Sequence, residues 1–256
     1  MTIWLASGNI HKKKELAMIL SDAMLETATI DLKIPADAGI AFDPEESGST
    51  FLENALIKAT ELYRLLGKGQ PVIADDSGIC VDALDGRPGI YSARYTGAKK
   101  GTRDQGSGIR DGCLQSECTN KQFRSQTSIP SPQSPVPDPL LSDTERNALL
   151  LAELGDNPRR SARFVCAMVL YCGPDRFFVA QETLEGELVL NAESARGTGG
   201  FGYDPILYIP ELGRTVAELS DGEKNRLSHR GKAGGTIGWI LYGLGLRESF
   251  TIETVQ

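Results

Sequence analysis

Hydrophobic positions along this chain fall into two kinds of segment. Short continuous apolar runs that hold β-branched residues are typical of buried strands. We expect strands at residues 2–6, about 25–32, 71–74, 162–172, 177–183 and 206–209. Segments whose apolar residues recur three and four positions apart are typical of helices that bury one face. We expect helices at about 10–20, 51–66, 143–154 and 221–244.

Three of these helices begin with a clear local signal. A Ser or Thr followed three residues later by Glu is typical of a capping box, in which the two side chains satisfy backbone N–H groups at the helix start. The pairs are Thr50 and Glu53, Ser142 and Glu145, and Ser220 and Glu223. After the first of these starts, Asn54 and Lys58 lie four residues apart on one helix face, so both side chains can point into a cleft.

Two adjacent carboxylates stand at the end of the run 71–74. Asp75 and Asp76 are followed by Ser77 and Gly78, residue types that are common in turns. Because successive strand residues point to opposite faces, both acids can face one cleft only if the strand ends between them. We therefore expect the strand to break here and its carboxylates to attract a hard cation. A solvated turn with two surface acids is the alternative.

A second candidate site follows the first strand. Ser7, Gly8 and Asn9 connect that strand to a helix whose first turn carries a run of lysines at 12–14. Free backbone N–H groups and the positive end of the helix dipole make such a turn an anion site. The helix dipole disfavours positive side chains at this end of the helix, and a bound phosphate would explain why the lysines are there. A solvated basic face is the alternative. The turn is not a Walker loop, because it lacks the required glycine spacing.

A third candidate is the glycine-rich run 197–205, which holds the aromatic residues Phe201 and Tyr203. Glycine allows the backbone to approach a ligand closely, and an aromatic ring held there offers a stacking face for a base. A purely structural turn is the alternative.

Residues 98–140 differ from the rest of the chain. Gly, Ser, Gln, Pro and Thr dominate the segment, and large apolar residues are few. Such a composition buries too little surface to offset chain entropy, which predicts a disordered or loosely packed insertion. A linker between two independent domains is the alternative, since 256 residues suffice for one large domain or two small ones.

Charge and composition narrow the classes of function. The net charge of −7 disfavours a surface that follows a nucleic-acid backbone. No apolar run reaches about 18 residues, and the chain start leads directly into a strand, so we expect neither a membrane span nor a signal peptide. The five cysteines are irregularly spaced, which suits reduced thiols in a cytoplasmic protein and disfavours a structural zinc site.

Six motifs in this order resemble the inosine triphosphate pyrophosphatase family, the house-cleaning dITP/XTP diphosphatases. They are Ser7-Gly8-Asn9-x-x-Lys12, Phe51-x-Glu53-Asn54-Ala55-x-x-Lys58-Ala59, Ala74-Asp75-Asp76-Ser77-Gly78, Pro88-Gly89-Ile90-Tyr91-Ser92-Ala93-Arg94-Tyr95, Gly200-Phe201-Gly202-Tyr203-Asp204-Pro205 and Ser228-His229-Arg230-Gly231-Lys232-Ala233. Each motif is weak alone, but six in the right order are specific. Because they flank residues 98–140, the resemblance favours one domain over residues 1–256, with an insertion where relatives have a short connection.

The resemblance implies a fold and a reaction. The fold would be α/β, elongated and two-lobed, around a long central mixed sheet with the nucleotide in a groove between the lobes. The protein would be a homodimer. The reaction would be Mg²⁺-dependent hydrolysis of ITP, dITP or XTP between the α- and β-phosphates, giving the monophosphate and pyrophosphate. It would need neither nucleic acid nor a membrane.

The resemblance also implies roles for particular residues. Asp76, Lys12 and Lys58 would be catalytic, with Asp76 as the general base. Glu46 and Asp76 would hold Mg²⁺, with Asp75 as a possible further ligand. Phe201 would stack on the base, while His229 and Arg230 would donate hydrogen bonds to a 6-keto purine. The residues implied in substrate binding are Ser7, Gly8, Asn9, Ile10, His11, Lys12, Asn54, Ser77, Phe201, Gly202, Tyr203, Asp204, Lys224, His229 and Arg230.

Three other functions stay open at this point. A pyrophosphatase for other modified nucleotides would use the same groove with a different base preference. A regulatory protein could bind the nucleotide without turning it over. A nucleic-acid-binding module would have to use the lysines at 12–14 together with Arg87 and Arg94. The acidic net charge argues against that last function.

Overall fold

The computed structural model describes residues 1–23, 30–67, 69–97 and 141–248. Its centre is a seven-stranded mixed sheet with the strand order β2-β1-β3-β4-β5-β6-β7. The strands are β1 (Thr2–Leu5), β2 (Asp31–Lys33), β3 (Val72–Val81), β4 (Ser161–Tyr171), β5 (Phe177–Leu188), β6 (Leu207–Ile209) and β7 (Arg214–Thr215). β1 runs parallel to β2 and β3, and all later pairs are antiparallel. This arrangement confirms the expected mixed sheet.

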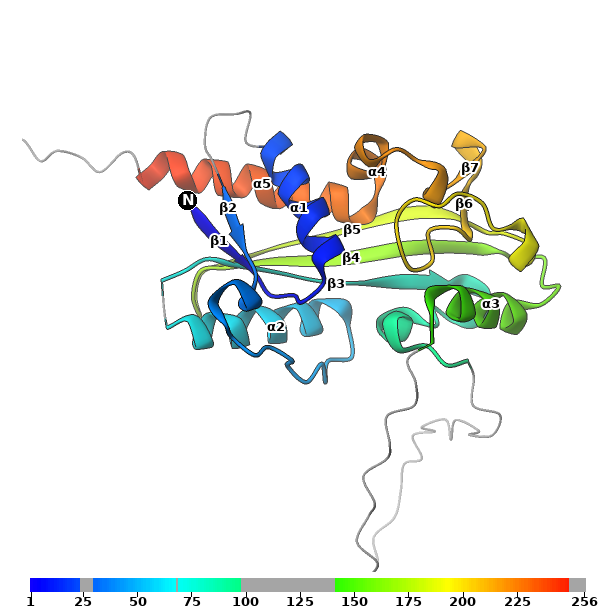
Figure 1. Ribbon diagram of the computed structural model, residues 1–256, viewed down its shortest axis with the longest axis horizontal. Helices are drawn as coiled ribbons and strands as arrows, with labels where there is room; N and C mark the ends of the chain where they lie inside the picture. Colours follow the sequence, from blue (N-terminus) through cyan, green and yellow to red (C-terminus); the bar gives the residue numbers. More distant parts are fainter. Residues whose placement is uncertain (24–29, 68, 98–140, 249–256) are drawn as a thin grey trace, which may run out of the picture.

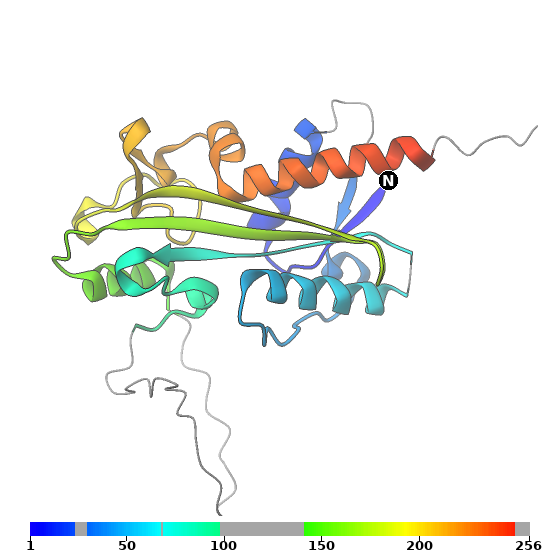
Figure 2. The same ribbon diagram turned by 180° about the vertical axis from the view of Figure 1, so that it is seen from behind.

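Helices cover both faces of the sheet (Figures 1 and 2). The α-helices are α1 (Ile10–Ala23), α2 (Phe51–Leu66), α3 (Asp143–Leu154), α4 (Asp221–Leu227) and α5 (His229–Glu248). The short 3₁₀ helices are η1 (Pro35–Ala38), η2 (Asp82–Leu84), η3 (Gly89–Arg94), η4 (Ala192–Ser194), η5 (Pro210–Leu212) and η6 (Val216–Glu218). None of the described helices is both long and apolar enough to cross a membrane.

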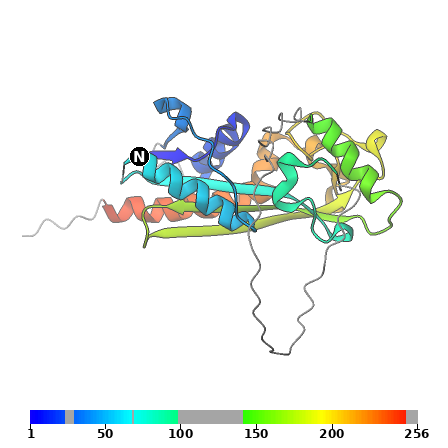
Figure 3. The same cartoon turned by 90° about the horizontal axis from the view of Figure 1, so that it is seen from below.

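The two faces of the sheet bury separate hydrophobic cores. On one face, α2 packs its apolar stripe, including Ala55 and Leu62, against β1, β3 and β4. α3 lies at the other end of the long strands (Figure 3), where it packs with β3, β4 and β5 in a further core. On the opposite face, α1 and α5 bury Leu16 and Ile237 against the sheet. The molecule is therefore elongated along β3, β4 and β5 (Figure 1).

Several sequence expectations are confirmed. The hairpin of β4 and β5 and the helices α1, α2 and α3 lie where the pattern placed them. The expected last helix is instead two helices, because Ser228 takes an extended conformation (φ −69°, ψ 157°) between α4 and α5. β2 begins only at Asp31, and residues 24–29 lie outside the described part of the chain.

The expectation that the strand breaks after Asp75 is wrong. β3 continues to Val81, and each of its residues is paired with β4, from Val72 opposite Tyr171 to Val81 opposite Ala162. β4 supplies a backbone partner along the whole strand and an apolar run from Phe164 to Tyr171, and this pairing outweighs the local turn preference of Ser77 and Gly78. Asp75 and Asp76 therefore point to opposite faces of the sheet.

Gly78 serves a packing role inside β3. A Cβ at this position would lie 2.4 Å from the carbonyl oxygen of Gly89 and 2.4 Å from Oγ of Ser92. Glycine thus lets η3 cross close over the strand.

The capping signals are confirmed in part. Complete capping boxes start α3 at Ser142 and α4 at Ser220. At α2, Thr50 Oγ1 accepts from the Glu53 N–H as expected, and the Glu53 carboxylate also accepts from the N–H and the hydroxyl of Ser49.

The predicted insertion at 98–140 lies outside the described residues. β3 precedes this segment and β4 follows it, and the two strands are hydrogen-bonded neighbours in one sheet. The segment therefore does not connect two separate sheets.

Candidate active site

A cavity of about 570 Å³ lies where the turn after β1, strand β3 and the starts of α3 and α5 meet. Most of the sequence-predicted site residues line it. They are Ser7, Gly8, Asn9, His11, Lys12, Glu46, Lys58, Asp76, Ser77, Phe201, Gly202, Tyr203, Asp204, Lys224, His229 and Arg230. Three predicted residues do not line it: Ile10, Asn54 and Asp75.

On the α2 side of the sheet, Asp76 sits in a cluster of buried polar groups. Lys58 Nζ lies 3.0 Å from Asp76 Oδ1 and 2.8 Å from Glu46 Oε1. Asn54 Nδ2 donates to Asp76 Oδ2 at 3.2 Å, which confirms that Asn54 and Lys58 share a helix face. Asn54 therefore holds Asp76 from behind while Lys58 joins Asp76 to Glu46.

The electrostatics of this cluster differ between its two acids. Burial raises the pKa of Asp76 above its ordinary value, although the charge of Lys58 opposes the shift. Glu46 is less buried, and the hydrogen bond and charge of Lys58 outweigh desolvation and lower its pKa. Asp76 is consequently a stronger base than an ordinary aspartate, which suits it for accepting a proton.

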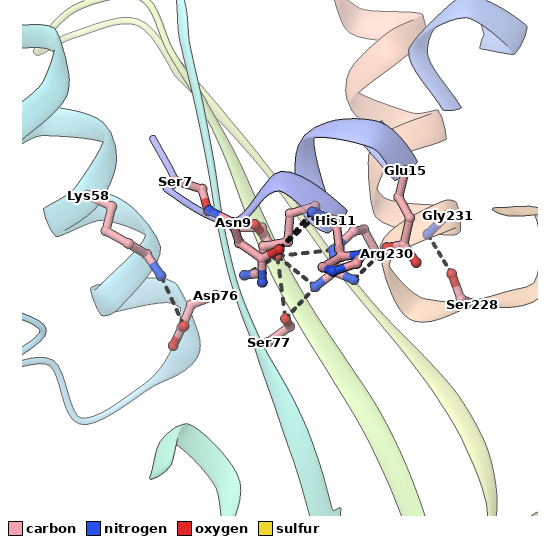
Figure 4. Close-up of polar contacts among 12 residues, drawn as sticks. Ser7, Asn9, His11, Glu15, Lys58, Asp76, Ser77, Ser228, Arg230 and Gly231 are labelled. Atoms are coloured by element: carbon pink, nitrogen blue, oxygen red, sulfur yellow. Dashed lines mark hydrogen bonds and ion pairs between the residues drawn. The ribbon is translucent and has the colours of Figure 1, made fainter. Parts of the chain in front are cut away.

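Asp75 belongs to a second cluster on the opposite face of β3. Its carboxylate lies 2.9 Å from Lys12 Nζ and 3.2 Å from Arg230 Nη2. Burial would raise the pKa of Asp75, but the charges of Lys12 and Arg230 outweigh it and hold the pKa well below the usual range. Figure 4 shows Asp76 turned toward Lys58 on one side of the strand, and Ser77 and Arg230 on the other. Asp75 thus orders two cations that line the cavity.

The turn after β1 is capped by its own side chains. Asn9 Oδ1 accepts from the N–H groups of His11 and Lys12, and Ser7 Oγ accepts from the Asn9 N–H. Lys13 pairs with Asp37 at 2.7 Å. The expectation of free N–H groups at this helix start therefore fails for His11 and Lys12. Side-chain amide and ammonium groups remain at the cavity wall.

A network of charges links α1 with α4 and α5. Lys224 Nζ lies 2.7 Å from Asp204 Oδ2 and 2.8 Å from Glu15 Oε1, and Arg230 Nη1 lies 2.8 Å from Glu15 Oε2. Sequence reasoning missed Glu15 as part of the site. The available signal was its position one turn after Lys12 on the same helix.

Phe201 presents its ring among cationic groups. Lys224 Nζ lies 4.7 Å from the ring centroid and the Arg230 guanidinium carbon lies 5.4 Å from it. The His11 ring is 5.8 Å away, with an interplanar angle of 30°. Cations within about 6 Å of an aromatic face are attracted to it, which keeps the ring in place at the cavity wall.

His229 is buried at the base of the cavity. Its ring stacks on Phe164 at a centroid distance of 4.9 Å, and its Nδ1 has no hydrogen-bond partner among the described residues. Burial and the neighbouring charges of Arg230 and Lys224 lower its pKa well below the ordinary value. The imidazole is therefore neutral and offers an unused polar atom. Buried polar atoms normally have a partner, so this one points to a ligand.

Further residues at the cavity were not predicted from the sequence. Arg94 lies 3.1 Å from Glu46 and lines the cavity, and Asp143 and Arg146 of α3 line it too. Arg94 lies within a motif that the sequence singled out, but it was given no role in a nucleotide site. Asp143 and Arg146 had no signal beyond the capping box that starts their helix.

The carboxylates of Glu46 and Asp76 are the best-placed pair for a metal ion. Among the described residues, no group of three or more His, Cys, Asp or Glu side chains is placed to hold one. Glu46 and Asp76 nevertheless converge on one ammonium group, Lys58 Nζ, at the cavity wall. Mg²⁺ is commonly bound by one or two carboxylates plus substrate phosphates and water, so this donor set fits Mg²⁺ bound together with a nucleotide.

Comparisons with known proteins agree with this geometry. The family model described as the Ham1 family matches residues 3–136 and 134–237. A protein of Treponema denticola named dITP/XTP pyrophosphatase is 42% identical over 233 residues, covering 91% of this chain and 94% of that protein. A Geobacillus kaustophilus protein with the same name is 38% identical, covering 90% of this chain and 89% of that protein.

Solved structures give the same result. The Ham1 protein of Staphylococcus aureus is 33% identical with a TM-score of 0.67, covering 95% of this chain and 100% of that one. A HAM1 protein from Coxiella burnetii is 31% identical with a TM-score of 0.68, covering 95% and 99%. Sequence motifs, fold and cavity therefore agree with the family match, and the chain belongs to the Ham1 family.

Proposed function

We propose that this protein hydrolyses the non-canonical purine nucleoside triphosphates ITP, dITP and XTP to the monophosphate and pyrophosphate. The observation that carries the proposal is a single cavity with two kinds of wall. One wall holds the carboxylates of Asp76 and Glu46 with Lys58, and another holds the Phe201 ring and the unpartnered His229 imidazole. Relatives named dITP/XTP pyrophosphatase support the same activity.

At the phosphate end, the protein would orient water and neutralise charge. Asp76 would orient a water molecule and accept its proton; its raised pKa and its contacts to Asn54 and Lys58 support this role. Lys12 and Lys58 would stabilise the negative charge that develops on the phosphate oxygens. The leaving group is pyrophosphate, because attack falls on the α-phosphorus.

Mg²⁺ is proposed as the cofactor, held by Glu46 and Asp76. A bound Mg²⁺ would neutralise phosphate charge and help to align the reacting groups. Asp75 faces away from this pair and its carboxylate is occupied by Lys12 and Arg230, so we assign it a structural role. The converging oxygens of Glu46 and Asp76 support the metal assignment.

At the base end, Phe201 would stack on the purine and His229 would recognise its 6-keto group. A neutral imidazole can donate through Nδ1 to a keto oxygen, whereas the 6-amino group of adenine would present a donor to a donor. Sites built on hydrogen bonds discriminate strongly in this way. GTP shares the 6-keto group, so its rate measures whether the cavity also rejects a 2-amino group.

Two further properties are proposed on the family resemblance. The protein would act as a homodimer, and it would work in the cytoplasm. Cys80 and Cys166 are free thiols in the described structure, which suits a reducing compartment. Light scattering on the purified protein tests the oligomeric state, because a dimer has twice the 27.6 kDa mass of the chain.

The test is pyrophosphate release from ITP, XTP, GTP and ATP, with and without Mg²⁺. We expect Mg²⁺-dependent turnover of ITP and XTP, weak turnover of ATP and GTP, and loss of activity in Asp76→Asn. Asp82→Asn is the matched control, because Asp82 lies just after β3, outside the cavity, in an exposed pair with Arg163. Equal rates on all four nucleotides would contradict the roles of Phe201 and His229. No turnover would favour a nucleotide-binding regulator.

A further inference from the structure

The first two turns of α3 hold the backbone of Gly202 at two points. The Asp143 carboxylate accepts a hydrogen bond from the Gly202 N–H at 2.7 Å. Asn147 Nδ2 donates to the Gly202 carbonyl oxygen at 3.1 Å. Asp143 and Asn147 are four residues apart and share one helix face, so α3 presents a matched acceptor and donor to a single residue.

Gly202 follows Phe201 directly, and its N–H belongs to the peptide group that joins the two residues, so the two bonds fix the residue next to the aromatic ring. Gly202 has a φ of 65°, in the left-handed region that favours glycine. The Phe201 N–H is itself held by Asp204 Oδ2 at 2.8 Å. The backbone is therefore tied on both sides of Phe201, by Asp204 at the Phe201 N–H and by α3 at Gly202.

Asn147 makes an unusual contribution for a buried residue. It is 8% exposed, and its Oδ1 has no partner among the described residues. Burying an unsatisfied amide oxygen costs stability, which offsets what the hydrogen bond to Gly202 contributes. Substitution of Asn147 therefore removes an unfavourable burial together with the hydrogen bond, and folding and ligand binding are measured separately for each variant.

We propose that Asp143 and Asn147 are positioning residues that fix Phe201 for stacking on the purine base. The inference rests on the proposed function, because it takes Phe201 as the stacking surface. Neither residue needs to touch the nucleotide for this role. The contacts instead remove the freedom that the glycine-rich loop would otherwise have, so that less entropy is lost when the base binds.

The test compares a ligand that has a base with one that has none. Calorimetry measures the Kd of IMP, the product nucleotide, and of tripolyphosphate for the wild type, Asn147→Ala, Asp143→Ala, Phe201→Ala and the Asn147→Ala/Phe201→Ala double variant. Thr144→Ala is the matched control, since Thr144 is an exposed residue of the same helix turn. A thermal melt of each variant checks that it folds. If Asn147→Ala is unfolded, the test uses Asp143→Ala, because the Asp143 side chain is half-exposed.

We expect the IMP Kd to rise roughly 3- to 10-fold in Asn147→Ala and in Asp143→Ala. This is the change in affinity that corresponds to the loss of one hydrogen bond of about 1 kcal/mol. The tripolyphosphate Kd should stay within twofold. In the Phe201→Ala background, Asn147→Ala should add almost nothing, because the residue acts through the ring. Additive effects of the two substitutions, or equal losses for IMP and tripolyphosphate, would overturn the inference. Wild type that binds IMP but does not hydrolyse ITP would contradict the proposed reaction and leave this result standing.

Discussion

Replacing Asp75 with asparagine tests the role of the charge cluster behind β3. Asp75 is 3% exposed and contacts Lys12 Nζ at 2.9 Å and Arg230 Nη2 at 3.2 Å. Asparagine keeps the shape of the side chain but removes its charge. It also places an amide donor beside two cations that offer only donors.

The size of the stability loss depends on which partners Lys12 and Arg230 retain in the variant. Removing one partner of a buried ion pair costs about 3–5 kcal/mol when the other charge is left uncompensated. Arg230 retains Glu15 at 2.8 Å, and the Lys12 side chain is 16% exposed and can be hydrated. We therefore expect Asp75→Asn to lower the free energy of unfolding by about 2–3 kcal/mol at pH 7, less than the cost of leaving a buried charge with no compensation.

The effect has a defined dependence on pH. The folded pKa of Asp75 is lowered, whereas in the unfolded chain it is about 3.9. A lowered folded pKa means that the stabilisation is fully present above about pH 5 and is lost as pH falls below the unfolded pKa toward the folded one. The stability gap between wild type and variant should thus be constant from pH 5 to 8 and should narrow below about pH 4, by at most about 1.4 kcal/mol per pH unit.

Urea denaturation at several pH values measures this gap. Asp82→Asn serves as the control, because Asp82 pairs with Arg163 at 2.7 Å at the surface and should cost at most about 1 kcal/mol. If Asp75→Asn were as stable as the control variant at pH 7, or if the gap stayed constant below pH 4, the reasoning about a buried charge cluster would be wrong.

Two further predictions concern the cavity wall and the strand behind it. Lys58→Gln should move the acid limb of the kcat/KM profile to higher pH, because the Lys58 charge opposes the raised pKa of Asp76. The pH dependence of kcat/KM measures this shift, with Lys58→Arg as the control that keeps the charge. An acid limb that does not move would contradict the coupling between Lys58 and Asp76. Gly78→Ala should lower the free energy of unfolding by at least about 2 kcal/mol in urea denaturation, since its Cβ would meet Gly89 and Ser92 at 2.4 Å. A Gly78→Ala protein as stable as the wild type would show that η3 can move away from β3.

Local features of this protein were predictable because they depend on nearby residues alone. The capping boxes at Ser142 and Ser220 form within one helical turn, and the four-residue spacing of Asn54 and Lys58 puts both on one helix face whatever the rest of the chain does. The apolar runs that became β4 and β5 carry their own signal in the same way. Motif order across the chain then identified the family before any geometry was known.

Only the tertiary structure decided which charges meet. Asp75 and Asp76 were expected to share a cleft, but pairing with β4 keeps β3 extended and sends them to opposite faces. Asp75 contacts Arg230, which lies 155 positions further along the chain. Gly202 is bound by Asp143 and Asn147 of α3, which lie 59 and 55 positions before it. Hydrogen-bond partners at such separations are set by how sheet and helices pack, and no local pattern records them. The burial that makes His229 neutral and raises the pKa of Asp76 is likewise a property of the assembled cavity, because desolvation depends on every element that surrounds the group.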